Sequence, residues 1–190
     1  IQGRYIGDVI RNTMDISNYA KGHRLPAMVL QCDILQAFDH LGHSCISNAL
    51  ELFNFGPHFK KWIKTLLAEN FSNVIMSGNL SQKIDVLRSA RQGDPIAAYL
   101  FIIGLELLAI KIRHEETIKG FKSGDREQKI ALLADDVTFY FQGEENEIER
   151  SLRNLFEVLH SFERISGLRT SAEKSKAMWI GSSVGKRAIC

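Results

Sequence analysis

The sequence predicts an α+β domain in which helices pack on one face of an antiparallel sheet. Two observations support this class. Apolar, β-rich runs such as "AMVLQCDIL" and "KIALLADDVTFYF" are typical of strands, while long segments with apolar residues at helical spacing lie between them. The order is strand, helices, hairpin, helix, hairpin, helix, strand, which is not the strict alternation of a parallel βαβ fold.

The first half of the chain contains three predicted helices, one strand and one hairpin. Residues 5–20 show helical periodicity and end near Lys21-Gly22, and residues 27–35 form the central strand. Two helices follow on either side of Gly56-Pro57, because Gly ends a helix and Pro is favoured at the start of the next. The segment 71–87 has a Ser-Gly-Asn turn between two strand-like arms and predicts a hairpin.

The second half begins with a polar loop that leads into a long apolar helix. Asp94 is expected to cap this helix, and Pro95 occupies its first position. A hairpin with Ala-Asp-Asp at its tip follows at 129–141. An amphipathic helix then runs from about residue 144 to 165 and ends at Ser166-Gly167. A basic polar stretch and a short strand over 176–181 complete the chain.

Composition indicates one ordered domain over residues 1–190, expected to be a fragment of a larger protein. The 190 residues are 45% hydrophobic and 24% charged with 3 Pro, which excludes a disordered tail. The net charge of +2 is too small to identify a nucleic-acid binder by itself. The longest apolar stretch, residues 96–110, is shorter than the ~20 residues of a membrane span, so no membrane partner is expected.

Three cysteines form neither a C-x-x-C pair nor an even disulfide framework, so an intracellular, reducing setting is expected. The sequence does not distinguish nucleus from cytoplasm.

Asp135 and Asp136 place two like charges between apolar flanks. One interpretation is a plain hairpin turn, although the Gly or Asn that tight turns favour is absent. The other is a metal site, because two carboxylates about 4 Å apart repel by about 4 kcal/mol at an effective dielectric of about 20. This segment alone leaves both open.

Asp33 closes the first predicted strand about 100 residues before that doublet. If the strands pair, three carboxylates meet at one edge of the sheet, a ligand set suited to magnesium. Two such ions are able to support an in-line phosphoryl displacement.

Four blocks in this order carry a family resemblance: "CDILQAFDHL", "RQGDPIAAYLF", "LLADDVTFYF" and "SGLRTSAEKSKAMWIG". The chain resembles, over residues 3–181, the reverse transcriptase domain of non-LTR (LINE-type) retrotransposons. The resemblance implies a polymerase palm with part of the fingers and with the thumb missing. It also implies an RNA-directed DNA polymerase that uses two Mg2+ ions, for which Mn2+ substitutes.

The resemblance assigns a role to each matching residue. Asp33, Asp135 and Asp136 are implied as catalytic and metal-binding residues, with Asp136 as a supporting carboxylate. Phe38 matches a steric gate beneath the sugar; without its spacing from Asp33 it would be an ordinary core aromatic. The remaining substrate-binding residues implied are Arg91, Gln92, Gly93 and Lys174. For Lys174, both Lys176 and a simple solvated lysine remain alternatives.

The chain also departs from the family pattern. Ser89 stands where Gly is usual, and Ile96-Ala97-Ala98 follows Pro95 where Leu-Ser-Pro is usual. No metal ligand is lost, so these departures indicate a diverged copy with an intact fold and reduced turnover.

The implied partners are an RNA template, a DNA primer, dNTPs and other domains of the parent polyprotein, namely a thumb and an endonuclease. Lys60, Lys61 and Lys64 beside Trp62 offer possible phosphate contacts, or merely a solvated helix face.

Two other functions compete with DNA synthesis. One is a catalytically decayed palm that binds RNA or protein. The other is an RNA-templated RNA polymerase, against which the bulky Phe38 and the Ala-Asp-Asp sequence both count.

Overall fold

A computed structural model of the chain describes residues 6–35, 37–68, 70–88 and 94–185. These residues form two compact units. The first comprises Ile1–Leu35, Leu108–Ser161 and Arg169–Cys190, and the second comprises Gln36–Leu107 and Phe162–Leu168. Two long helices, α5 (Ala97–His114) and α6 (Glu145–Ser166), contribute residues to both units. The expectation of one domain over the whole length stays a prediction.

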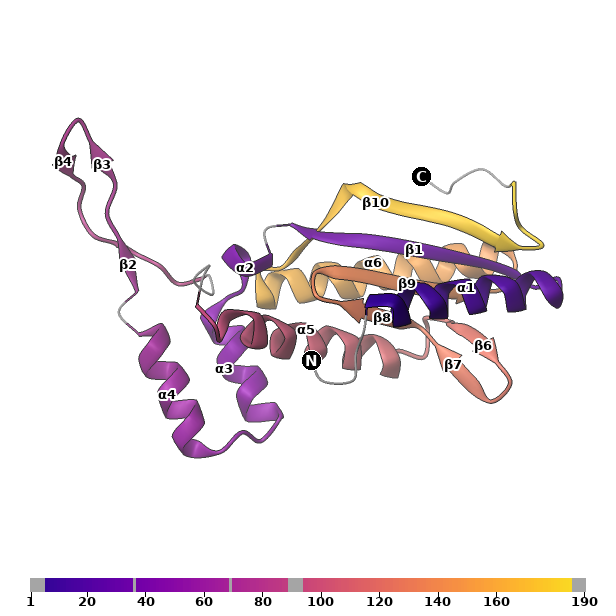
Figure 1. The fold of residues 1–190 in the computed structure, drawn as a ribbon, viewed down its shortest axis with the longest axis horizontal. Helices are drawn as coiled ribbons and strands as arrows, with labels where there is room; N and C mark the ends of the chain where they lie inside the picture. Colours follow the sequence, from indigo (N-terminus) through magenta and orange to yellow (C-terminus); the bar gives the residue numbers. More distant parts are fainter. Residues whose placement is uncertain (1–5, 36, 69, 89–93, 186–190) are drawn as a thin grey trace. The chain divides into compact units, whose positions relative to one another are not determined.

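A four-stranded antiparallel sheet organises the first unit (Figure 1). Its order is β10-β1-β9-β8, so the earliest strand lies between two strands from the second half of the chain. The strands are β1 (Pro26–Leu35), β8 (Ile130–Leu133), β9 (Asp136–Gln142) and β10 (Arg169–Gly181). The predicted central strand and the predicted late hairpin are thereby confirmed.

Helix α1 (Ile6–Gly22) packs on one face of this sheet. Its Ile16 and Ala20 share a buried cluster with Val29 of β1 and Tyr140 of β9. Side chains that alternate onto the opposite face are buried as well: Met28, Leu30, Phe139 and Phe141. In Figure 1, α6 runs behind the sheet whereas α1 lies in front of it. The expectation that helices pack on one face only is therefore wrong, because the sheet presents apolar side chains on both faces.

A hydrogen-bonded pair of hydroxyl groups joins α1 to the sheet. The Thr13 hydroxyl donates to the carbonyl oxygen of Val9 at 2.8 Å. The Tyr140 hydroxyl, also 2.8 Å from Thr13 Oγ1, must then be the donor in their contact. Burial raises the pKa of Tyr140. The buried tyrosine is thus satisfied by the helix that covers it.

Strand β10 is longer than the sequence predicts. The polar stretch from residue 169 to 175 was not expected to be extended, yet the strand begins at Arg169. Its pairing with β1 is interrupted once: Gln31 opposes Lys176, but Asp33 already opposes Ser171. Four residues, 172–175, therefore face the single residue Cys32. This large β-bulge lies on the edge strand β10. Because the residues there are polar, they lack the apolar pattern from which a strand is predicted.

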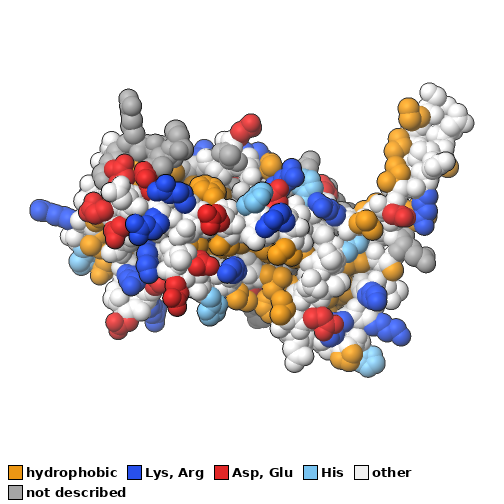
Figure 2. All heavy atoms as spheres, turned by 180° about the vertical axis from the view of Figure 1, so that it is seen from behind, with side chains coloured by type: hydrophobic (Ala, Val, Ile, Leu, Met, Phe, Trp, Pro, Cys, Tyr) orange, Lys and Arg blue, Asp and Glu red, His pale blue; other side chains and the backbone are white. Residues whose placement is uncertain are grey.

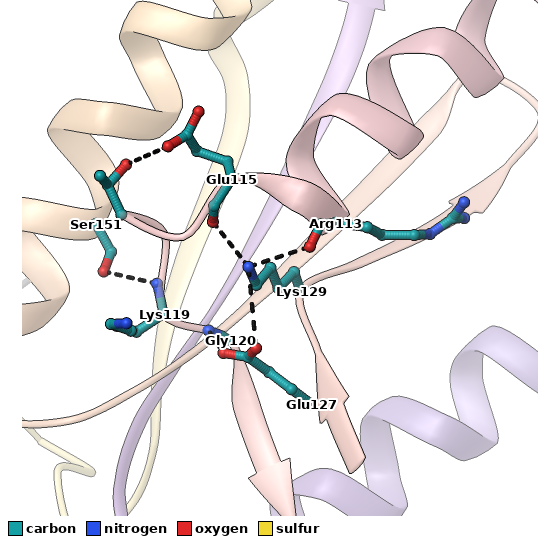
Figure 3. Close-up of polar contacts among 8 residues, drawn as sticks. Arg113, Glu115, Lys119, Gly120, Glu127, Lys129 and Ser151 are labelled. Atoms are coloured by element: carbon teal, nitrogen blue, oxygen red, sulfur yellow. Dashed lines mark hydrogen bonds and ion pairs between the residues drawn. The ribbon is translucent and has the colours of Figure 1, made fainter.

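A small hairpin that the sequence did not predict precedes β8. It consists of β6 (Phe121–Ser123) and β7 (Arg126–Gln128). Next to it, the buried Lys129 Nζ donates to the carbonyl oxygens of Arg113 at 3.2 Å and Glu115 at 2.8 Å (Figure 3). These carbonyls lie at the C-terminal end of α5, where helical carbonyls lack intrahelical donors. Lys129 therefore ties the end of α5 to the start of β8.

The second unit contains the helices that the Gly-Pro signal predicts. They are α3 (His43–Leu52) and α4 (Pro57–Leu67), with a four-residue helix α2 (Ala37–His40) before them that was not predicted. Asp94 Oδ1 accepts a hydrogen bond from the Ile96 N–H at 3.0 Å, but α5 begins only at Ala97, so Asp94 and Pro95 lie in a turn before the helix and the predicted cap and first position are wrong by about two residues. Within the described ranges, no helix combines the length and hydropathy that a membrane span requires.

The predicted hairpin of the second unit is confirmed, with its ladder interrupted midway. Strands β2 (Phe71–Ser72) and β5 (Ile84–Asp85) pair at its base, and β3 (Ile75–Met76) and β4 (Asn79–Leu80) pair at its tip. Ser77 and Gly78 both have positive φ, 50° and 82°, as a tight hairpin turn requires. Hydrophobic side chains are exposed along this hairpin (Figure 2).

Candidate active site

Strand pairing brings the predicted carboxylates to one end of the sheet. Asp33 of β1 lies directly opposite Asp136 of β9 in the antiparallel register. Directly opposed residues project from the same face with Cβ atoms about 5 Å apart. Asp135 precedes Asp136 in the turn between β8 and β9. All three residues belong to the first compact unit, so this arrangement is internal to it.

The turn that carries Asp135 is a two-residue hairpin loop. Leu133 pairs with Asp136, which leaves Ala134 and Asp135 as the loop residues. Ala134 adopts a φ of 52°, in the left-handed region, which costs a residue with a Cβ on the order of 1 kcal/mol. The turn interpretation of the doublet is thus correct for the backbone. It does not compete with a metal interpretation, because the same turn leads directly into Asp136, which lies opposite Asp33.

Asp33 has a cationic neighbour. Its Oδ2 atom lies 3.1 Å from Nζ of Lys174, and the Asp33 side chain is 27% exposed while that of Lys174 is 66% exposed. Among the residues that the structure describes, this buried oxygen has no hydrogen-bond partner, so the ammonium lies within ion-pair distance without hydrogen-bond alignment. Lys176, the alternative to Lys174, is exposed and opposes Gln31 further along the strand.

The β-bulge in β10 aims Lys174 at Asp33. The Lys174 N–H donates to Ser171 Oγ at 3.3 Å, and Ser175 Oγ donates to the Ser171 carbonyl at 2.6 Å. These bonds hold the bulge residues 172–175 in a compact, turn-like segment opposite Cys32. Burial raises the pKa of the Cys32 thiol, an effect that a hydrogen bond with Ser175 partly offsets. Ser171 and Ser175 were not predicted as site residues, because only the register of β10 reveals their role.

The donor chemistry of this end of the sheet fits a hard divalent cation. Carboxylate oxygens are the ligands that Mg2+ prefers, and the buried Asp33 Oδ2 accepts no hydrogen bond from the described part of the chain. In the described part of the chain, however, no three His, Cys, Asp or Glu side chains converge closely enough to hold a metal ion. The backbone therefore brings the acidic residues together, while the side chains are not gathered into a complete ligand set.

The other predicted site residues are only partly described. The backbone of Phe38 lies in α2 of the second unit, and its side chain is outside the described residues. Arg91, Gln92 and Gly93 also lie outside them. The roles assigned to these four residues therefore stay predictions.

Helix α4 presents the basic and aromatic surface noted in the sequence. Trp62 is 61% exposed. Lys60 is paired with Glu51 at 2.5 Å, whereas Lys61 and Lys64 line a shallow depression. Two of the three lysines are thus arranged to meet an anionic partner.

Comparisons with known proteins agree on one family. The pattern described as "Reverse transcriptase (RNA-dependent DNA polymerase)" matches residues 5–185. A type-1 R2 retrotransposable-element Pol polyprotein of Popillia japonica is 25% identical over 186 residues, 97% of this chain and 25% of that protein. The transposon TX1 149 kDa protein of Xenopus laevis is 28% identical over 142 residues, 75% of this chain and 11% of that protein. This chain therefore spans a quarter or less of either relative.

Solved structures of telomerases share the fold. Apo telomerase from Candida tropicalis superposes with a TM-score of 0.66 over 92% of this chain and 32% of that one, at 12% identity. Telomerase from Candida albicans, solved with a fragment of telomeric RNA, gives a TM-score of 0.59 over 92% of this chain and 30% of that one, at 15% identity.

Proposed function

This chain belongs to the reverse transcriptase family of RNA-dependent DNA polymerases, and from that premise we propose that it forms the palm, with part of the fingers, of an active polymerase. The proposed reaction is the transfer of nucleotides from dNTPs to the 3′-hydroxyl of a DNA primer on an RNA template. The observation that carries the proposal is the pairing of Asp33 with Asp136 beside the Ala134-Asp135 turn.

In this proposal the three aspartates have unequal roles. Asp33 and Asp135 hold divalent cations, two Mg2+ ions for which Mn2+ substitutes, and Asp136 supports them from the facing strand. When bound, such ions activate the attacking hydroxyl and stabilise the leaving oxygen of an in-line displacement. Lys174 lies at the same end of the sheet and supplies a positive charge toward the triphosphate. The strained Ala134 keeps the acidic turn short, and so keeps Asp135 at the end of the sheet.

Substrate recognition is assigned to residues of the second unit. We propose that Phe38 lies beneath the sugar and that Arg91, Gln92 and Gly93 contact the incoming nucleotide and the template. The exposed Lys61 and Lys64 of α4 add phosphate contacts. Because the relatives are several times longer, further domains, a thumb and an endonuclease, are proposed to complete the enzyme.

Primer extension on poly(A)/oligo(dT) with magnesium tests the proposal in the protein that carries these residues together with a thumb. Asp135→Asn should lower the rate roughly 100-fold or more, because charge stabilisation worth several kcal/mol is lost. The matched control is Asp125→Asn, which changes another exposed aspartate at a hairpin turn of the same unit. Equal extension by the wild type and Asp135→Asn would refute the assignment. Template binding without extension would instead support a decayed, RNA-binding palm.

The proposed sugar gate has its own test. Phe38→Ala should raise incorporation of ribonucleotides relative to deoxynucleotides, because the bulk that meets a ribose 2′-hydroxyl is removed. The ratio is measured with each nucleotide in competition. An unchanged ratio would show that Phe38 is an ordinary packing residue.

A further inference from the structure

Lys174 contacts the carboxylate that the proposed function reserves for a cation. Its ammonium lies 3.1 Å from Asp33 Oδ2, and no hydrogen bond from residues 6–35, 37–68, 70–88 or 94–185 competes for this buried oxygen. The lysine is therefore positioned against the proposed metal ligand itself.

We propose that Lys174 is a built-in counter-cation that competes with a divalent ion for Asp33, so that cation binding and release of Lys174 are one coupled exchange. This inference rests on the proposed function, because it takes Asp33 as a metal ligand. Without the ion, the ammonium neutralises one of three neighbouring carboxylates. When the ion binds, the lysine is freed from Asp33 and becomes available to the phosphates of the incoming nucleotide.

The local electrostatics favour such an exchange. Asp136 lies opposite Asp33, and Asp135 precedes Asp136 in the adjoining turn, so this end of the sheet concentrates negative charge. A single ammonium compensates it only in part, and a divalent ion compensates it better. The Lys174 side chain is 66% exposed, and its contact with Asp33 lacks hydrogen-bond alignment. An exposed ion pair of this kind opens at little cost.

The β-bulge fixes the backbone position from which Lys174 contacts Asp33. Ser171 accepts from the backbone of Lys174, and Ser175 donates to the Ser171 carbonyl. These two bonds hold the backbone of Lys174 where its side chain reaches Asp33. The contact should therefore weaken when the bulge is loosened, even though no charge is changed.

Binding of Mn2+ to the 190-residue chain, followed by the EPR signal of the free ion at constant pH and salt, tests the exchange. If the Lys174–Asp33 contact is closed about nine-tenths of the time, removing it should tighten Mn2+ binding about 10-fold. We expect this for Lys174→Ala and Lys174→Gln. Lys176→Ala, which removes the same charge two residues away, should change the affinity less than about 2-fold. Ser175→Ala, which keeps the charge, should tighten binding by an intermediate factor.

The outcomes separate this inference from the proposed function. If Asp33→Asn abolishes Mn2+ binding but Lys174→Ala leaves it unchanged, the exchange is wrong and the metal site stands. If Lys174→Ala and Lys176→Ala tighten Mn2+ binding equally, the effect comes from the general loss of one positive charge, and the exchange is again refuted. Absence of Mn2+ binding, or binding indifferent to Asp33→Asn, refutes both.

Magnesium supplies a second readout without catalysis. In the chain labelled with 13C-lysine, the Cε resonance that disappears in Lys174→Ala should shift on addition of Mg2+, because the ammonium leaves Asp33. The same resonance should not respond in Asp33→Asn. If the Lys174 Cε resonance of the wild type does not shift at saturating Mg2+, the exchange is refuted.

Discussion

Replacing the buried Lys129 by Met removes one ammonium and little volume. Lys129 is 8% exposed, and its Nζ donates to two carbonyl oxygens, those of Arg113 and Glu115, at the end of α5. It also lies 3.9 Å from Glu127 Oε2 (Figure 3). Met keeps most of the aliphatic stem, so the change isolates the polar contacts from the packing. The positive charge at a helix C-terminus is lost as well.

The expected loss of stability is about 3 kcal/mol, the lower end of what breaking a buried charged contact costs. Two carbonyls lose a charged donor, each worth about 1.5–3 kcal/mol, but the desolvation cost of the ammonium is recovered at the same time. Glu127 keeps a second partner, since its Oε1 accepts from the Gly120 N–H at 2.8 Å. The carboxylate is therefore not left without a hydrogen bond.

Urea unfolding followed by circular dichroism measures this loss as a shift of the midpoint. The matched control is Lys111→Met, on the helix α5 that Lys129 contacts. Lys111 is 63% exposed and pairs with Glu115 at 3.2 Å, so its removal should cost no more than about 0.5 kcal/mol. Lys129→Met must therefore cost more than about 1 kcal/mol and more than Lys111→Met. Otherwise water hydrogen-bonds the carbonyl oxygens at the end of α5, and Lys129 does not stabilise the fold as proposed.

Three more residues lead to predictions of different kinds. Gly181→Ala should cost at least about 3 kcal/mol, because at φ 66° the added Cβ would collide with the carbonyl oxygen of Leu25. Tyr140→Phe should cost about 1 kcal/mol through the lost hydrogen bond to Thr13, measured by the same unfolding assay. Burial raises the pKa of Cys45 to about 11, so its thiol stays neutral in the fold while the unfolded thiol ionises. The contribution of the Cys45 thiol to the free energy of unfolding should be complete below pH 9. It should fall by about 2 kcal/mol as the pH rises toward 11.

Each of these has a control. Gly78→Ala, also at positive φ but in open space, should cost only about 1 kcal/mol. Tyr99→Phe changes a tyrosine that is 63% exposed and should be neutral. The Cys45 effect is the pH dependence of the stability difference between the wild type and Cys45→Ala. A difference that stays constant from pH 8 to 10.5 would contradict it, as would equal losses for the two glycines or the two tyrosines.

The helices were predictable because their signals are local. Pro57 starts α4 immediately after Gly56, and Gly167, with a φ of 81°, ends α6. Asp94 closes the turn just before α5 through its own side chain, which accepts from the Ile96 N–H. In each case the deciding contacts lie within a few residues along the chain, so sequence order is a sufficient guide to them.

The first half of β10 and the β6–β7 hairpin were not predictable in the same way. The first half of β10 is polar, and the β6–β7 hairpin carries Lys122 and Glu127 opposite each other. These segments are extended because of the partners they meet, and pairing between distant strands leaves no periodic apolar signal in a half-exposed segment.

The sequence by itself determined the chemical identity of the site: an aspartate at the end of one strand, an acidic doublet at a turn, and lysines near the end of the chain. Only the tertiary structure decided that Asp33 opposes Asp136, and that a four-residue bulge delivers Lys174 rather than Lys176 to Asp33. The physical reason is that register is a non-local property. Register is set by the backbone groups that pair between strands more than a hundred residues apart in the sequence. A shift of one residue along a strand places a side chain on the opposite face of the sheet.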